Sequence, residues 1–262
     1  MTTTIPMPEI VIDRITAVHR LKVLTINMHK GFNAFNRRFI LPELRDAVRA
    51  TDADLVFLQE VLGSHDRHAR RYHDWPPTSQ YEFLADSIWP QFAYGRNSVY
   101  PHGHHGNALL SKFSIIEREN LDVTVHGNEQ RGLLHCILDV PGHREVHAIC
   151  VHLGLRESHR KLQIRLLAEL LSSLNPAAPT IVAGDFNDWR LRADAVLAEH
   201  GLVEAFGWAY GAPAKSFPAR FPLLCLDRIY VRNATCHEPM VLATRPWSHL
   251  SDHAPLATEV HL

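Results

Sequence analysis

Residues 181–188 read Ile-Val-Ala-Gly-Asp-Phe-Asn-Asp, an apolar run that ends in a glycine and is followed by an acid and an amide. A buried strand that stops at Gly184 would expose Asp185 and Asn187 on the same side, because side chains alternate along extended backbone. A carboxylate beside a carboxamide suits a polar reacting group, such as a water molecule or a phosphate oxygen. Ordinary turns use the same residue types, so this stretch by itself allows both interpretations.

Polar residues of the same kinds stand at the ends of other apolar runs. Six of them directly follow or precede such a run: Asn27, Glu60, His152, Asp227, Asp252 and His253. If these ends meet at one rim, several carboxylates crowd together, and they must then take up protons or bind a cation. Oxygen ligands, with neutral histidine as an extra, favour Mg²⁺ or Mn²⁺ over zinc. A hard divalent ion beside a carboxylate base and a histidine suits hydrolysis of a phosphate ester.

Several of these residues also have a structural alternative. Glu60 could be a surface acid or a helix cap, and Asn27 could be a turn residue. Asp227 could pair with the adjacent Arg228, and His152 could be a histidine satisfied inside the core. The functional interpretation therefore depends on whether the strand ends converge.

The spacing of apolar residues predicts the strands and helices that must position these side chains. Apolar or alternating runs predict strands at 21–27, 54–60, 106–112, 114–121, 131–140, 145–152, 180–184, 226–232, 239–243 and 254–260, with a weaker one at 9–18. Helical spacing predicts helices from an N-cap at Asn36 through Val48, over 81–89 and 157–174, and a short one after Trp189. Pro141-Gly142 is typical of a hairpin turn.

Strands in runs with few helices between them differ from the strict alternation of a parallel doubly wound sheet. We expect an α/β protein in which two stacked mixed β-sheets are flanked by helices. We expect one domain over residues 1–262, with residues 1–8 as a loose tail.

Composition and net charge limit the classes of protein to which this sequence can belong. The 262 residues carry a formal net charge of −1, without the basic surplus typical of a dedicated nucleic-acid binder. No run is long and apolar enough to span a membrane, and no basic region with an apolar core precedes the chain's first strands. The four cysteines lack a CxxC pair, which favours reduced thiols. We expect a cytoplasmic protein with no obligate protein partner.

Seven motifs resemble those of the endonuclease/exonuclease/phosphatase (deoxyribonuclease I-like) superfamily, in that family's order and over nearly the whole chain. They are LTIN (24–27), LQEV (58–61), GNALLSK (106–112), VHL (151–153), GDFN (184–187), LDRI (226–229) and SDHAP (251–255). The run Asn27-Met28-His29-Lys30-Gly31 is similar to the Asn-x-His-Lys-Gly variant of small bacterial members. The resemblance implies a four-layer α/β sandwich and a divalent-metal phosphoesterase.

The resemblance also implies roles on the metal side. Glu60 corresponds to the principal metal ligand, with Asn27 close to the metal and the phosphate. Asp252 corresponds to an additional carboxylate beside the metal. The implied ion is Mg²⁺, with Mn²⁺ as a possible substitute.

On the catalytic side, Asp185 would orient or deprotonate the attacking water, and Asn187 would hold that water or the transition state. His253 would donate to a phosphate oxygen, with Asp227 fixing its tautomer. His152 stands where deoxyribonuclease I-like and sphingomyelinase-like members keep a second histidine, whereas abasic-site endonucleases tend to have tyrosine. An abasic-site repair function is therefore disfavoured.

Two further residues and one loop are candidates for substrate contact. Arg131 could clamp a phosphate, or it could form a structural ion pair with Glu129 or Glu157. Asn107 could hold a catalytic group or cap backbone. The histidine-rich run 100–106 lacks the ligand separation of a zinc site, and we interpret it as a mobile loop over the rim.

The leading function is a phosphodiesterase that uses a divalent metal to hydrolyse a phosphodiester in nucleic acid or in a phospholipid-type headgroup. The alternatives are a phosphomonoesterase that acts on a small soluble phosphate ester, and a non-catalytic scaffold. Intact Glu60, Asp185 and His253 argue against the scaffold.

Overall fold

Twelve strands in the described part of the chain form two six-stranded sheets. The structure is a computed structural model that describes residues 18–35, 37–127 and 129–262. Sheet 1 has the order β11 (Thr235–Val241), β12 (Leu256–His261), β1 (Arg20–Asn27), β2 (Leu55–His65), β4 (Gly103–Ser111) and β3 (Gln91–Tyr100). Sheet 2 has the order β5 (Ser114–Asp122), β6 (Gly132–Val140), β7 (His143–His152), β8 (Thr180–Asp185), β10 (Asp227–Arg232) and β9 (Val203–Glu204).

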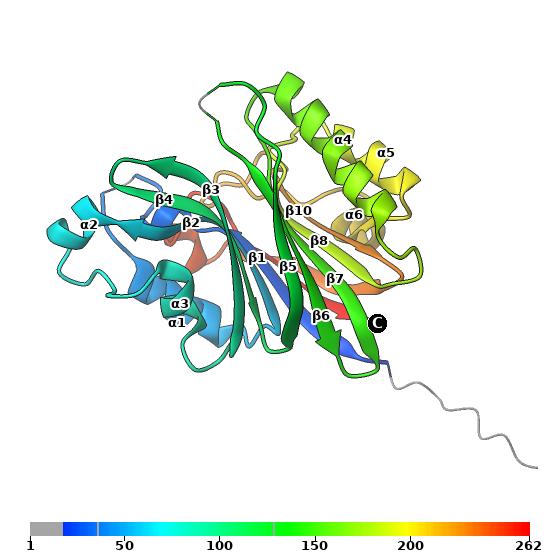
Figure 1. Cartoon of the computed structure of the whole chain (residues 1–262), viewed down its shortest axis with the longest axis horizontal. Coiled ribbons are helices and arrows are strands. Elements are labelled where there is room, and N and C mark those ends of the chain that lie inside the picture. Colours follow the sequence, from blue (N-terminus) through cyan, green and yellow to red (C-terminus); the bar gives the residue numbers. More distant parts are fainter. Residues whose placement is uncertain (1–17, 36, 128) are drawn as a thin grey trace, which may run out of the picture.

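Helices lie outside the two sheets, as Figure 1 shows. On the side of sheet 1 are α1 (Leu41–Ala50), α2 (Asp66–Arg71) and α3 (Gln80–Ala85), and on the side of sheet 2 are α4 (Glu157–Ser173), α5 (Arg192–Glu199) and α6 (Ala205–Tyr210). Two short 3₁₀ turns, η1 (His29–Gly31) and η2 (Trp247–His249), complete the elements. No helix of the described residues is both long enough and apolar enough to span a bilayer.

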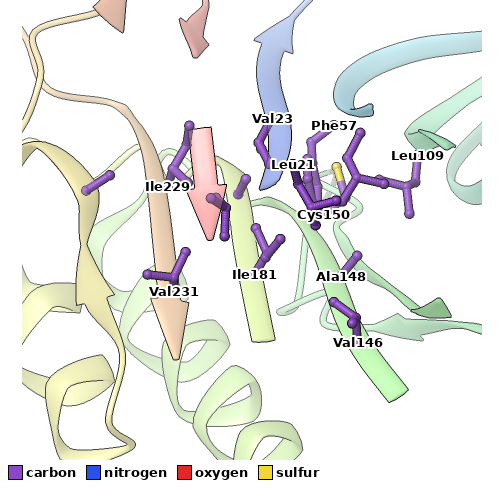
Figure 2. Packing of buried hydrophobic residues seen from close by; sticks show 14 of the residues in the cluster. Leu21, Val23, Phe57, Leu109, Val146, Ala148, Cys150, Ile181, Ile229 and Val231 are labelled. Carbon is purple, nitrogen blue, oxygen red and sulfur yellow. The ribbon is translucent and has the colours of Figure 1, made fainter. Parts of the chain in front are cut away.

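Three apolar layers explain why the sheets stack. The inner faces meet through residues such as Phe57 of sheet 1 and Ile181 of sheet 2, which pack in one buried cluster (Figure 2). Leu24 faces the other way and packs with Leu44 of α1, while Val182 packs with Leu167 of α4. Alternate residues of the central strands are thus buried on opposite faces. The expected four-layer α/β sandwich is confirmed.

The polar strand ends converge because of strand direction. β1 runs parallel to β2, and β7 runs parallel to β8, so the carboxyl ends of each pair lie at one edge. β12 and β10 run antiparallel to β1 and β8, so their amino ends lie at that same edge. Residues at the carboxyl ends of β1 and β8 therefore lie at the same edge as residues at the amino ends of β12 and β10.

A β-bulge in β2 sets the direction of Glu60. The pairing of β2 with β4 shifts between Leu58 and Val61, and Glu60 has a φ of 55°. Leu58 and Val61 both pack in the outer cluster of sheet 1, which regular alternation would not permit for residues three apart. The bulge absorbs the extra residue, a device common beside functional sites.

Several predicted elements differ in extent. The first helix was predicted from an N-cap at Asn36 but begins at Leu41, because Phe39 forms an isolated bridge with Phe32 and Pro42 suits the first helical turn. Helix α3 ends at Ala85, where Asp86 takes a φ of 44°, and not at Trp89. Strand β2 continues beyond Glu60 to His65. The tail 1–8 and residues 9–17 of the weak first strand lie outside the described residues.

The prediction of a mobile loop at 100–106 was wrong. Strand β3 was missed, and it forms a hairpin with β4, so that only a two-residue turn separates Tyr100 from Gly103. His104 and His105 are therefore strand residues. The predicted hairpin turn at Pro141-Gly142, between β6 and β7, is confirmed.

Candidate active site

Asp185 lies where the polar strand ends meet. Its Oδ2 atom is 3.6 Å from Nε2 of His152 and 3.9 Å from Nε2 of His253. The second ring nitrogen of His253, Nδ1, is 2.8 Å from Oδ2 of Asp227. All four side chains are buried. The register explains the meeting, since His152 of β7 and Asp227 of β10 each pair with Asp185 of β8.

Two amides fix the Asp185 carboxylate. The Nδ2 of Asn27 donates to Oδ2 at 3.1 Å, and the backbone N–H of Asn187 donates to Oδ1 at 2.9 Å. The Nδ2 of Asn187 also donates to Oδ2 at 3.3 Å. Asn187 has a φ of 51°, a region that asparagine tolerates better than most residues. Because Asn27 belongs to sheet 1 and Asp185 to sheet 2, this contact joins the sheets at the rim.

The buried groups change one another's protonation. Burial raises the pKa of the Asp185 carboxyl to about 7, against the opposing charge of His253. Burial would lower the pKa of His253, but the carboxylates of Asp227 and Asp185 raise it to about 10. Burial, together with the charge of Arg131, holds the pKa of His152 well below its usual range. One cationic and one neutral imidazole thus flank the carboxylate of Asp185 near pH 7.

Two further carboxylates each contact a basic residue of η1. The Nζ of Lys30 is 2.9 Å from Oε2 of Glu60, and Nδ1 of His29 is 3.1 Å from Oδ2 of Asp252. Burial would raise the pKa of Glu60, but the charge of Lys30 and its hydrogen bond to Oε2 hold that pKa well below its usual range. Both carboxylates are therefore ionised near neutral pH, and each already attracts a positive group.

Two sets of side chains could hold a cation. Within the described residues, Asp185, Asp227 and His253 have ligand atoms that lie within 4.8 Å of one another. The hydrogen bond between His253 Nδ1 and Asp227 Oδ2 already engages these two side chains with each other, which suits proton transfer better than metal binding. Glu60 and Asp252 are electrostatic neighbours with ionised oxygens, and their basic partners show that positive charge is favourable there. These hard oxygen donors are the better fit to a divalent ion.

The sequence from residue 24 to residue 253 matches the model of the Endonuclease/Exonuclease/phosphatase family. The chain belongs to this family. It is 58% identical over 243 residues to the protein YbhP of Escherichia coli strain K12, an alignment that covers 92% of this chain and 96% of that protein.

Solved structures of the family share the fold. An endonuclease/exonuclease/phosphatase from Beutenbergia cavernae DSM 12333 superimposes with a TM-score of 0.73 at 19% identity, over 93% of this chain and 72% of that one. TDP2 of D. rerio, complexed with single strand DNA product, superimposes with a TM-score of 0.66 at 18% identity, over 92% and 98% of the two chains. At these identities the likeness concerns architecture.

Arg131 and Asn107 lie beside the site with structural partners. Arg131 forms the ion pair with Glu129 that the sequence allowed, at 2.9 Å, and donates to the carbonyl of Leu153. Asn107 is fully buried, and its Nδ2 donates to the carbonyls of Gly132 at 2.9 Å and of Cys150 at 3.3 Å. The backbone-binding alternative for Asn107 therefore describes this structure, and its amide links β4 to sheet 2.

Sequence reasoning assigned no site role to His29 or Lys30, and it considered His105 only as part of the predicted loop 100–106 over the rim. The first two stand within the quoted run that begins at Asn27, so that motif carried a signal. His105 is close enough to Glu60 and Arg131 to be affected by their charges, and burial lowers its pKa to about 4. No periodicity distinguishes His105 from its neighbours, because its place depends on the missed hairpin.

Proposed function

We propose that this family member is a phosphodiesterase that depends on a divalent metal, Mg²⁺ or in its place Mn²⁺. Members of the family are typically phosphoesterases, and the observation that carries the proposal is the arrangement around Asp185. One carboxylate oxygen of Asp185 faces both His152 and His253, while Asn27 and Asn187 fix its position. A group that can take a proton and a group that can give one are thus within 4 Å of each other.

Glu60 and Asp252 would hold the metal, with Asn27 beside them. A divalent ion bound there would offset negative charge on a phosphoryl oxygen. Lys30 and His29 would then exchange their carboxylate partners for the substrate's oxygens or for solvent. The paired carboxylates explain why the ion should be a hard one, since their donor atoms are all oxygen.

The buried residues would carry the proton transfers. Asp185, with its pKa near neutral, would orient and deprotonate the attacking water, and Asn187 would hold that water. The water oxygen bonds to phosphorus as the bond from phosphorus to the leaving oxygen breaks. His253, kept protonated by Asp227, would donate its proton to that oxygen. The products are an alcohol and a phosphomonoester.

The charge of the site favours a diester over a monoester. A monoester dianion needs several free cationic groups. Here the pKa values of His152 and His105 are lowered, and Arg131 is neutralised by Glu129. Once a metal takes Glu60, Lys30 and the protonated His253 remain as cations, and His253 is already paired with Asp227. A singly charged diester matches that balance better.

Two grooves lined by residues of the site or beside it also suit a diester, which has a substituent on each side of phosphorus. One groove, of about 510 Å³, is lined by residues that include His105, Arg131 and Arg156. Another, of about 490 Å³, is lined by residues that include Phe217 and Asp252. The substrate would be a nucleic acid or a phospholipid-type headgroup ester. The DNA product bound by TDP2 supports the first class, and the net charge of −1 does not favour a long polyanion.

Hydrolysis of bis(4-nitrophenyl) phosphate and of 4-nitrophenyl phosphate, each with Mg²⁺ and with EDTA, tests the proposal. We expect metal-dependent turnover of the diester in preference to the monoester. Preference for the monoester would instead favour a phosphomonoesterase. Turnover of neither compound, with no Mn²⁺ bound in a titration, would favour a scaffold that has lost catalysis.

A further inference from the structure

Residues 216–224 form a short hairpin with an apolar tip. Phe217 forms an isolated bridge with Leu224, and the backbone N–H of Leu224 donates to the carbonyl of Phe217 at 2.8 Å. At the tip, Phe221 is 69% exposed and Leu223 is 67% exposed. Large apolar side chains exposed together mark a surface that contacts another apolar phase.

The base of this hairpin holds the reactive groups. The Oγ of Ser216 accepts from the backbone N–H of Asp227 at 3.1 Å, and the ring of Phe217 lies 5.0 Å from the ring of His253. The backbone N–H of Ala219 donates to the carbonyl of Asp252 at 2.7 Å. The apolar tip is therefore fixed relative to the catalytic pair by hydrogen bonds and ring packing.

A groove joins the hairpin to the site. It has a volume of about 490 Å³ and is lined by apolar side chains of both walls, Phe35 and Ile40 on one and Phe217 and Pro218 on the other. Asp252 lines the same groove, so the groove opens beside a carboxylate that we place at the metal. An apolar substituent of a phosphodiester would fit along it.

Near each wall of the groove, an exposed phenylalanine lies next to an arginine. The guanidinium of Arg220 lies 5.9 Å from the centroid of the Phe221 ring, and that of Arg37 lies 6.0 Å from the Phe35 ring. Phe35 is 74% exposed. An apolar ring next to a cation matches the boundary of an anionic lipid layer, where hydrocarbon adjoins negative headgroups.

We propose that this surface, formed by Phe35, Arg37 and the hairpin 216–224, docks on an anionic lipid layer and that the substrate is a phosphodiester of a lipid in that layer. The inference rests on the proposed function and selects one of its two substrate classes. The exposed tip includes the aliphatic residue Leu223, which would insert into hydrocarbon but offers no flat face on which a base can stack.

A protein partner or a nucleic-acid strand would fit this surface less well than a lipid layer. A stable protein partner needs about 800 Å² on each side, far more than three or four side chains on a narrow tip provide. A nucleic-acid strand needs a continuous basic track, whereas the walls of this groove are mainly apolar. A lipid layer requires only a small apolar tip flanked by cations.

Co-sedimentation of the full chain with vesicles tests this inference. The vesicles contain phosphatidylcholine alone or mixed with phosphatidylglycerol, and a single-stranded oligonucleotide serves as a competing probe. The variant combines Phe221→Ser with Leu223→Ser, and Trp208→Ser is the matched control, because Trp208 is 71% exposed and does not line this groove. Turnover of bis(4-nitrophenyl) phosphate is measured in all three proteins.

We expect wild type to bind the anionic vesicles, the double variant to lose at least about tenfold in partition coefficient, and Trp208→Ser to bind like wild type. Turnover of the soluble diester should be equal in all three. Absent binding by wild type, or undiminished binding by the double variant, would overturn the inference. Oligonucleotide binding that depends on Phe221 and Leu223 would overturn it in favour of nucleic acid. If wild type does not hydrolyse the soluble diester, the proposed function is contradicted, whereas the vesicle-binding result still tests the docking surface.

Discussion

The Nδ1 atom of His253 lies 2.8 Å from Oδ2 of the buried Asp227, while its Nε2 atom lies 3.9 Å from Asp185. The imidazole is therefore fixed at one nitrogen, and in the proposed mechanism the other nitrogen serves the reacting phosphate. We propose that Asp227 acts through His253 without contact with substrate.

Replacement of His253 or its partner should lower turnover to different degrees. We expect His253→Ala to reduce kcat by more than about 10² and Asp227→Asn to reduce it by about 10–100-fold, since the second removes only the charge that keeps His253 protonated. Stopped assays on bis(4-nitrophenyl) phosphate measure both. Glu259→Gln, at the surface pair of Glu259 with His261, is the matched control and should be neutral. Wild-type kcat in His253→Ala would contradict the assigned role.

Asp185→Asn should remove activity without loss of stability. The amide cannot accept a proton from water, so kcat should fall by more than about 10². Because burial raises the pKa of this carboxyl to about 7, its ionised form is unfavourable in the folded protein, and the variant's Tm at pH 8 should equal or exceed that of wild type. Thermal denaturation measures the Tm of the variant and of wild type, and the kinetic assay measures kcat for both. A variant with a markedly lower Tm would indicate a structural role for the carboxylate.

Glu60→Gln should change the metal requirement. With one ligand charge removed, the Mg²⁺ concentration for half-maximal activity should rise by at least about tenfold. EDTA should abolish turnover of wild type. Glu157→Gln, at an exposed pair with Arg190, serves as the control. An unchanged Mg²⁺ titration in Glu60→Gln would remove Glu60 from the set of ligands.

Stability of the metal-free protein should fall as the pH rises from about 7 to about 10. His253 has a folded-state pKa raised to about 10, whereas the unfolded value is near 6.5. Between these values the folded state holds a proton that the unfolded state has released, so higher pH favours unfolding. The stabilisation is complete below the unfolded pKa and is lost as the pH passes the folded one. Urea denaturation across this range should show the slope in wild type and a weaker slope in His253→Gln. Equal slopes would show that His253 does not titrate there.

Asn107→Ala tests whether this residue is structural. Its amide donates to the carbonyls of Gly132 and Cys150, both inside the sandwich. Loss of the amide should reduce the free energy of unfolding by about 1–3 kcal/mol. KM for the diester should change little if Asn107 does not contact substrate. A rise in KM with unchanged stability would restore the substrate-binding prediction.

Much of the fold followed from local pattern. Runs such as 180–185 alternate between two buried faces, and a strand with both faces apolar must lie inside a layered sandwich. The ends of those runs carried Asn27, Glu60, Asp185 and His253. Parallel pairing of β1 with β2 and of β7 with β8, and antiparallel pairing of β12 with β1, bring these residues to one edge. Strand β3 was missed because its exposed and buried residues do not alternate regularly. Helix α2 was missed because it buries no residue at all.

The sequence by itself determined the identity and order of the polar strand ends, because each is fixed by the apolar run beside it. Only the tertiary structure decided which groups face one another. The pairing of Lys30 with Glu60 depends on the bulge in β2 and on the positive φ of Lys30, and neither has a sequence period. The apolar hairpin at 216–224 likewise lies beside Asp252 only because Ala219 bonds to a segment more than thirty residues away. Contacts of this kind arise from chain closure in three dimensions, which no local pattern encodes.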